Sequence, residues 1–198
     1  MIKYSNGQTF KLKTKKSPEN HKEKPVFSHG NRGMNLEGDI NLSNEFYRTN
    51  NIALITKRPT PINVVKVDYS RGAIITNAYF EKQSTTDYNG VYKGKYLDFE
   101  AKSTRKTTSF PLHNISPHQI DHLKRVLFHG GIAFFIIELA RLNEVYLLDA
   151  SYVVNFYEKS DRKSIPYIDI KNNGHKIKSG FSPRLDYIEI IEKIYMNS

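Results

Sequence analysis

The chain has 198 residues, 38% of them hydrophobic and 25% charged, a composition typical of one soluble domain with a well-buried core. Lys and Arg number 30 against 20 Asp and Glu, and the resulting net charge of +10 favours a polyanionic partner, above all nucleic acid. The absence of cysteine excludes disulfides and thiolate zinc sites, and the longest apolar run, residues 132–137, is too short to cross a bilayer. We therefore expect a soluble, cytoplasmic protein with no membrane partner.

The beginning of the chain differs in composition from the rest. Residues 1–30 are rich in lysine and poor in core-forming side chains, so we expect them to form a flexible basic arm. Residues 31–198 are expected to form a single domain.

Hydrophobic periodicity and turn signals predict the elements of this domain in chain order. They are a helix at 35–50, strands at 52–56, 62–69, 73–80, 88–92 and 95–102, a helix opening at Ser116 and stopped by Gly130 and Gly131, strands at 132–139 and 145–148, and a final helix at about 184–196. Short turns at 70–72 and 93–94 join two of the strand pairs into hairpins. The expected fold is an α/β domain with a mixed, largely antiparallel curved sheet and flanking helices.

The segment 96–102 carries the chemistry. Its side chains alternate, so Asp98, Glu100 and Lys102 share the face opposite the apolar residues. Asp87 begins the preceding strand, and antiparallel pairing can bring it beside Glu100. Paired carboxylates with an adjacent amine suit Mg²⁺ or Mn²⁺ and the hydrolysis of a phosphodiester. An Asp, a hairpin and then Glu-x-Lys is the pattern of the PD-(D/E)xK nucleases, and the alternative is a solvated strand face with cross-strand ion pairs.

A second motif lies on the helix that opens at Ser116. His118 and His122 share a face, as in the His-Glu-x-x-His zinc proteases, but Gln119 stands where that motif needs its glutamate base. We interpret the histidines as phosphate contacts or solvated residues. Gln119 can also be explained as the capping partner of Ser116.

Eight segments in one order resemble the RecU family of Holliday junction resolvases, over about residues 30–195. They are 33–37 (GMNLE), 57–61 (KRPTP), 78–80 (AYF), 84–90 (STTDYNG), 98–102 (DFEAK), 108–112 (TSFPL), 118–119 (HQ) and 183–187 (PRLDY). The resemblance implies a restriction-endonuclease-like PD-(D/E)xK core and a homodimer. It also implies paired symmetric incisions in four-way DNA junctions during homologous recombination and DNA repair.

The resemblance further implies roles for single residues. Those that it places around Mg²⁺, for which Mn²⁺ can substitute, are Thr85, Asp87, Glu100 and Gln119. The catalytic set is Asp87, Glu100 and Lys102, with Lys102 stabilising the transition state. Asp98 is interpreted as an ion-pair partner, and Glu37 is a further candidate for the metal site.

The hairpin at 57–80 resembles the projecting stalk of the family, which is thought to enter the junction centre. The expected DNA contacts are Lys57, Arg58, Arg71 and Phe80. The tip at 70–72 is shorter than the resemblance leads us to expect, so Arg71 is either a DNA contact or an ordinary solvated arginine. Branched DNA is the expected partner, with recombinase and branch-migration proteins as further partners.

Two other functions remain open at this point. One is a non-catalytic junction-binding or strand-annealing protein, in which the acidic residues are structural. The other is a site-specific restriction nuclease, which would share the same core. The carboxylates favour an enzyme, because a pure binder has no reason to gather acids where DNA phosphates must lie.

Overall fold

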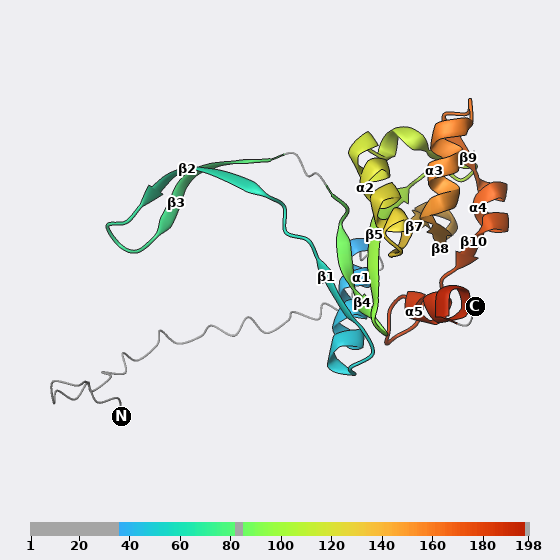
Figure 1. Cartoon of the computed structure of the whole chain (residues 1–198), viewed down its shortest axis with the longest axis horizontal. Helices are drawn as coiled ribbons and strands as arrows, with labels where there is room; N and C mark the ends of the chain where they lie inside the picture. Colours follow the sequence, from blue (N-terminus) through green and yellow to red (C-terminus); the bar gives the residue numbers. More distant parts are fainter. Residues whose placement is uncertain (1–35, 82–84, 197–198) are drawn as a thin grey trace. The chain divides into compact units, whose positions relative to one another are not determined.

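The computed structural model describes residues 36–81 and 85–196, and the expected basic arm at 1–30 lies outside them. Figure 1 shows the elements in sequence colours. They are α1 (Leu36–Thr49), β1 (Leu54–Lys57), β2 (Ile62–Asp68), β3 (Ile74–Phe80), β4 (Tyr88–Tyr92), β5 (Lys95–Thr104), β6 (Ser109–Pro111), η1 (Leu112–Asn114), α2 (Pro117–Phe128), β7 (Ile132–Leu139), η2 (Ala140–Leu142), β8 (Glu144–Asp149), α3 (Ala150–Lys159), β9 (Ser164–Pro166), α4 (Tyr167–Asn173), β10 (Gly174–Lys176), α5 (Tyr187–Ile191) and η3 (Glu192–Met196).

The main sheet has six strands in the order β1-β4-β5-β7-β8-β10. Strands β5 and β7 pair in parallel, and the other four pairings are antiparallel. A parallel pair needs a crossover connection, which α2 supplies here. The expectation of a mixed, largely antiparallel sheet with flanking helices is confirmed.

Strand β7 is buried on both faces. Phe134 and Ile136 join one core with residues of α1 and α5, whereas Ala133, Phe135 and Ile137 join a second core with residues of α2 and α3. A strand covered by helices on both sides has no polar face, which explains its continuous apolar sequence. The sheet is therefore the middle layer of three.

An aromatic ladder links the strands that carry the acidic residues. Tyr88, Phe99 and Phe134 lie opposite one another on β4, β5 and β7. The ring centroids of Tyr88 and Phe99 are 4.9 Å apart, and those of Phe99 and Phe134 are 4.6 Å apart. Because Phe99 faces this core, its neighbours in β5 point to the opposite side of the sheet.

Gly90 allows β1 to lie close against β4. A Cβ atom at Gly90 would be 2.2 Å from the backbone oxygen of Leu54. Any larger residue would push β1 away, and with it Arg58, which directly follows β1.

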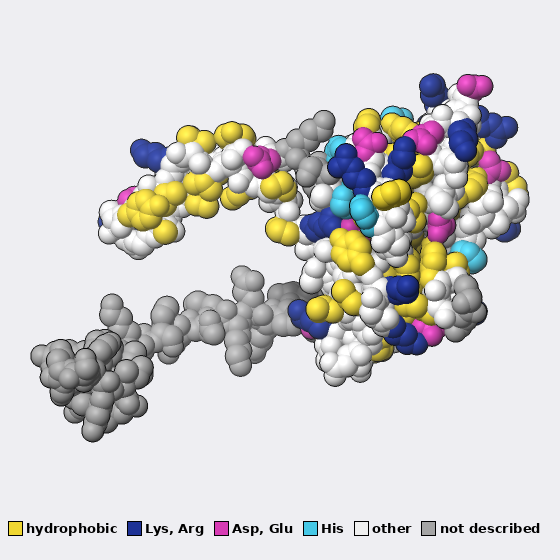
Figure 2. All heavy atoms as spheres, in the orientation of Figure 1, with side chains coloured by type: hydrophobic (Ala, Val, Ile, Leu, Met, Phe, Trp, Pro, Cys, Tyr) yellow, Lys and Arg dark blue, Asp and Glu magenta, His cyan; other side chains and the backbone are white. Residues whose placement is uncertain are grey.

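Strands β2 and β3 form a separate two-stranded sheet, as the sequence predicted. Its apolar side chains lie on the surface, where they gather along the hairpin in Figure 2. The large exposed ones are Ile62, Val64, Val65, Ile74, Ile75, Tyr79 and Phe80. Exposed apolar surface of this kind often marks a region that meets a partner.

Some predicted boundaries were wrong. The strand expected at 52–56 begins at Leu54, because Ile52 still closes the end of α1 through a hydrogen bond from its nitrogen to the Tyr47 oxygen. The helix expected from residue 184 begins at Tyr187, because the Asp186 side chain caps it. Elements α3, α4, β6, β9 and β10 were not predicted. Among the described helices, none is long and apolar enough to span a membrane.

Candidate active site

The two acids expected to cooperate meet between β4 and β5. Asp87 immediately precedes β4, and the pairing of Tyr88 with Phe99 puts Asp87 opposite Glu100. The backbone nitrogen of Asp87 donates to Glu100 Oε2 at 3.1 Å, and that of Ala101 donates to Asp87 Oδ2 at 3.3 Å. The structure brings the two residues together, while their catalytic role stays a prediction.

Glu100 is completely buried and has two further partners. Its Oε1 lies 2.8 Å from Lys102 Nζ and accepts a hydrogen bond from Gln119 Nε2 at 2.6 Å. Burial raises the pKa of Glu100 to about 8, the nearby Asp87 carboxylate adds to the rise, and Lys102 opposes it. A buried carboxylate beside a second acid is a position that a cation would stabilise.

The Gln119 side chain makes two hydrogen bonds, one of which is the expected helix-capping bond. Its Oε1 accepts a hydrogen bond from the backbone nitrogen of Ser116 at 3.0 Å, which is the helix-capping interaction. Its Nε2 simultaneously donates to Glu100. The start of α2 is therefore tied to the carboxylate pair, and ligation of a metal by Gln119 stays a prediction.

A cleft of about 210 Å³ lies beside Asp87. Its lining residues are Leu36, Glu37, Asp87, Tyr88, Ala101, Ser103 and Glu138. Glu37 from α1 shares this cleft with Asp87, and its Oε1 lies 2.6 Å from Lys57 Nζ. Glu37 is thus near the expected site, and Thr85 is partly buried two residues before Asp87.

A metal ion needs several donor groups close together. Within residues 36–81 and 85–196, no group of three or more His, Cys, Asp or Glu side chains is close enough together to hold a metal ion. Asp87 and Glu100 nevertheless fit Mg²⁺, which is commonly held by one or two carboxylates while water and substrate phosphates fill the remaining positions.

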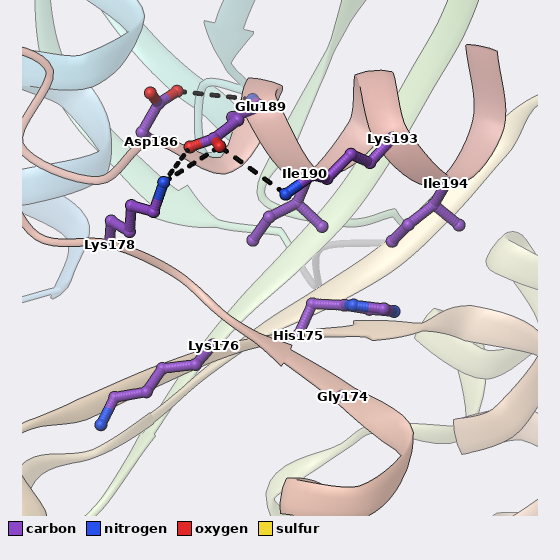
Figure 3. A pocket seen from close by; sticks show the side chains of 9 residues that line it. All are labelled: Gly174, His175, Lys176, Lys178, Asp186, Glu189, Ile190, Lys193 and Ile194. Atoms are coloured by element: carbon purple, nitrogen blue, oxygen red, sulfur yellow. Dashed lines mark hydrogen bonds and ion pairs between the residues drawn. The ribbon is translucent and has the colours of Figure 1, made fainter. Parts of the chain in front are cut away.

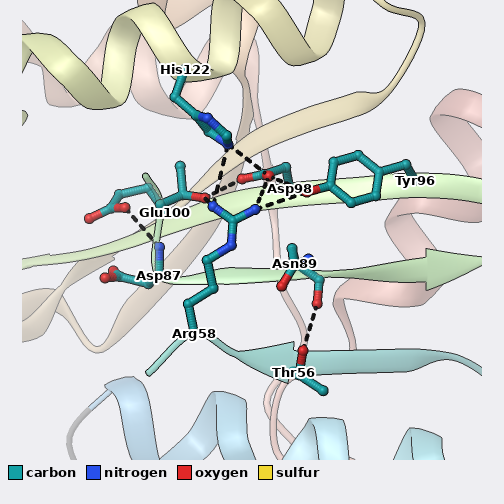
Figure 4. A network of polar contacts seen from close by, with 9 residues as sticks. Thr56, Arg58, Asp87, Asn89, Tyr96, Asp98, Glu100 and His122 are labelled. Carbon is teal, nitrogen blue, oxygen red and sulfur yellow. Dashed lines mark hydrogen bonds and ion pairs between the residues drawn. The ribbon is translucent and has the colours of Figure 1, made fainter. Parts of the chain in front are cut away.

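A second polar network surrounds Asp98, which is completely buried (Figure 4). Asp98 Oδ2 lies 2.7 Å from Arg58 Nη2 and 2.9 Å from His122 Nε2. The Tyr96 hydroxyl donates to the same oxygen at 2.8 Å, and Thr86 Oγ1 donates to Oδ1. The interpretation of Asp98 as an ion-pair partner is confirmed.

This network changes how two residues are understood. The side chain of His122 is 22% exposed and contacts Asp98, so its interpretation as a solvated residue was wrong. The side chain of Arg58, an expected DNA contact, is 17% exposed and is directed at Asp98. Sequence reasoning missed this network, although Asp98 shares a strand face with Glu100 and His122 follows Gln119 by three residues on α2.

The other expected DNA contacts lie on the surface. Phe80 is 79% exposed, the Lys57 side chain is 43% exposed, and Arg71 is exposed at the tip of the β2–β3 hairpin. The structure leaves these side chains accessible, and contact with DNA stays a prediction for each of them.

A larger cavity, of about 430 Å³, lies between β10 and α5 (Figure 3). Its lysines are already paired with acids. Lys178 and Lys193 lie 2.9 Å and 3.8 Å from oxygens of Glu189, and Lys176 lies 2.7 Å from Glu144 Oε1. Because each of these lysines already has an acidic partner and no expected site residue lines the cavity, we assign it no part in catalysis.

The chain matches a family model, full-length relatives and a solved structure. The family model described as "RecU: Recombination protein U" matches residues 31–193. A protein from Geobacillus sp. (strain WCH70) named Holliday junction resolvase RecU is 50% identical, over 100% of this chain and 99% of that protein. A protein of the same name from Geobacillus kaustophilus (strain HTA426) is 47% identical, over 98% of each. The solved structure of Archaeoglobus fulgidus Hjc, a Holliday junction resolvase, matches with a TM-score of 0.42 at 13% identity, covering 71% of this chain and 93% of that chain.

Proposed function

This chain belongs to the RecU family, and on that premise we propose that it is a Holliday junction resolvase, an endonuclease that cuts four-way DNA junctions. The observation that carries the catalytic part of the proposal is the meeting of Asp87, Glu100 and Lys102. Two carboxylates on neighbouring strands, with an amine 2.8 Å from one of them, are the groups that metal-assisted phosphodiester hydrolysis requires. The names of the full-length relatives support the junction as the substrate.

Asp87 and Glu100 would hold Mg²⁺, with Thr85 and Gln119 completing the site and Mn²⁺ able to substitute. Such an ion, when bound, polarises a phosphodiester and lowers the pKa of a coordinated water. Lys102, whose Nζ contacts Glu100, would stabilise the negative charge that develops on the phosphate. Gln119 would orient Glu100 through its amide.

Two copies of the chain would act together on one junction. A homodimer has two active sites related by a two-fold axis, which suits paired symmetric incisions in a four-way junction. The exposed apolar surface of the β2–β3 hairpin supports an intermolecular role for this stalk. Lys57, Arg71 and Phe80 are the accessible candidates for DNA contact, with the lysine-rich residues 1–30 adding non-specific attraction.

The rival function is a non-catalytic junction-binding or strand-annealing protein. The pairing of buried Glu100 with partly buried Asp87 disfavours it, because two acids repel phosphates and are costly to hold together unless they serve a cation. The basic net charge alone would suit either function, so it does not distinguish them.

The deciding experiment incubates the full chain with four-way, Y-shaped and linear DNA of matched sequence, in Mg²⁺, in Mn²⁺ and in a chelator. We expect paired, symmetric cuts in the four-way DNA only when a divalent ion is present. Tight junction binding without cutting under any metal condition would favour the non-catalytic protein. Equal cutting of linear DNA would favour a restriction nuclease.

A further inference from the structure

Strand β5 and helix α2 meet at two points. Glu100 contacts Gln119 at one, and at the other Asp98 contacts His122, which lies about one turn further along the helix. The first pair belongs to the proposed metal site. The second pair lies outside it, so its role must follow from the other groups that it touches.

Asp98 is an expensive residue to bury. It has no exposed surface and lies two residues from Glu100, so it loses its hydration beside a second buried acid. The side chains that donate to it or pair with it are Arg58, Thr86, Tyr96 and His122. Apolar residues of similar volume would often be as stable as a buried ion pair. The network is therefore better explained by the positions in which it holds neighbouring residues than by a contribution to the free energy of unfolding.

The geometry that it fixes is the position of Asp87. The backbone nitrogen of Arg58 donates to the backbone oxygen of Asp87 at 2.8 Å. The guanidinium of the same arginine donates to Thr86 Oγ1 at 3.2 Å, and Thr86 directly precedes Asp87. Arg58 thus holds the chain at and before Asp87, while Asp98 holds Arg58.

The guanidinium has little capacity left for a phosphate. Its Nη2 donates to both Asp98 and the Tyr96 hydroxyl, at 2.7 Å and 2.8 Å. Its Nη1 contacts Thr86 and lies 3.4 Å from His122 Nε2. Figure 4 shows the Arg58 side chain between these partners and directed at Asp98.

We propose that Arg58 and Asp98 are positioning residues, which hold Asp87 opposite Glu100 and contact neither the scissile phosphate nor the metal ion. This inference rests on the proposed function, because the position of Asp87 matters to the rate only if the chain cuts DNA. Misplacing a reacting group by about 1 Å can slow a reaction by about 100-fold, so loss of this support should be visible in cleavage.

The test uses Arg58→Lys, which keeps the charge and removes the planar fork, and Asp98→Asn, which keeps the shape and removes the charge. For each variant, junction affinity and its salt dependence are measured without metal. The single-turnover cleavage rate on saturating junction and the Mg²⁺ concentration for half-maximal rate are then measured. Arg48→Lys, the same substitution at an exposed position of α1, is the matched control and should behave as wild type.

We expect both variants to bind the junction within about twofold of wild type and with the same salt slope, because no phosphate contact is lost. Cleavage should be at least about tenfold slower, with a raised Mg²⁺ requirement, because Asp87 is no longer held in place. If Asp98→Asn melts below the assay temperature, Arg58→Lys decides alone.

Normal cleavage together with weakened junction binding would identify Arg58 as a phosphate contact and overturn the inference. Arg58→Lys would then cut like wild type, whereas Arg58→Gln would bind the junction more weakly, with a salt slope reduced by about one. Wild-type cleavage and a wild-type Mg²⁺ requirement in Arg58→Lys would have the same consequence. A wild-type chain that never cuts would instead overturn the proposed function, so the two failures are distinguishable.

Discussion

Tyr88 stacks on Phe99 with their ring planes 7° apart, on the side of β5 opposite to Glu100. Tyr88 directly follows Asp87, and Phe99 directly precedes Glu100. The ring pair that fills the core therefore also sets the register in which the two acids meet. Apolar packing on one face of these strands determines the geometry of the charged face.

Phe99→Ala should destabilise the chain by about 3–5 kcal/mol, because it opens a cavity between Tyr88 and Phe134 in a fully buried core. Urea unfolding followed by circular dichroism measures this loss. Val91→Ala on β4, where the side chain is 48% exposed, is the control and should cost less than about 1 kcal/mol. Equal losses in both variants would show that the aromatic ladder adds no stability of its own.

Asp87→Asn and Glu100→Gln should each abolish cleavage while leaving junction affinity nearly unchanged. Neither substitution adds negative charge near the DNA phosphates, so neither can weaken electrostatic attraction, and a loss of cleavage must come from metal binding or chemistry. Cleavage assays and metal-free binding titrations on the same junction separate the two effects. Native cutting rates in either variant would remove that residue from the catalytic set.

The raised pKa of Glu100 makes metal-free stability depend on pH. The carboxyl has an ordinary value of 4.5 and a value of about 8 in the folded chain. Between these values the unfolded chain is ionised while the folded chain keeps its proton. Stability should therefore fall as pH rises through this window, by up to about 1.4 kcal/mol per pH unit for this group.

Thermal melting in a chelator at several pH values, with wild type and Glu100→Gln, measures this effect. The melting temperature of Glu100→Gln, relative to that of wild type, should increase as pH rises, because glutamine does not ionise. Added Mg²⁺ should raise the melting temperature of wild type more at the alkaline end, where the ion no longer displaces a proton. Parallel melting curves for the two proteins would show that Glu100 is not the group responsible.

Local sequence patterns predicted the parts of the fold that depend on nearby residues. The hairpin turn at 93–94, the capped start of α2 and the two-residue period of β5 were each found where expected, and the turn predicted at 70–72 lies within the longer loop 69–73. Glu100 and Lys102 share a face for the same reason, since alternation along a strand requires only a strand.

The features that were missed depend on residues far apart in the chain. Helix α4 has seven residues and owes its stability to packing on the sheet, which a local pattern does not reveal. Asp98 and Arg58 are 40 positions apart, and they meet because β1 ends beside β4, the strand that lies between β1 and β5. The family motif that contains Arg58 suggested a DNA contact, because the motif gives no sign of this distant partner. In the structure the guanidinium of Arg58 faces Asp98.

The β2–β3 hairpin offers a test of how a junction is told from a duplex. Asp68 pairs with Ile74, and residues 69–73 form the loop beyond this last pair, with Gly72 at a φ of 113° and Arg71 exposed. Replacing these five residues with Asn-Gly would close the same strand pair with a two-residue turn. The change removes Arg71 and Tyr69 and leaves β2 and β3 in register.

The shortened protein should keep its melting temperature and its response to Mg²⁺, because the loop contributes nothing to the six-stranded sheet. Its preference for four-way over linear DNA should fall, since the tip would no longer reach the phosphates and unpaired bases at the junction centre. Competition binding at matched salt gives the ratio of junction to duplex affinity. Arg71→Gln in the intact loop measures the effect of the charge at the tip without changing the length of the loop.

If the shortened protein retains the wild-type ratio of junction to duplex affinity, the stalk is only structural. Recognition of the junction must then come from the spacing of the two active sites in a dimer, which raises the effective concentration of the second site.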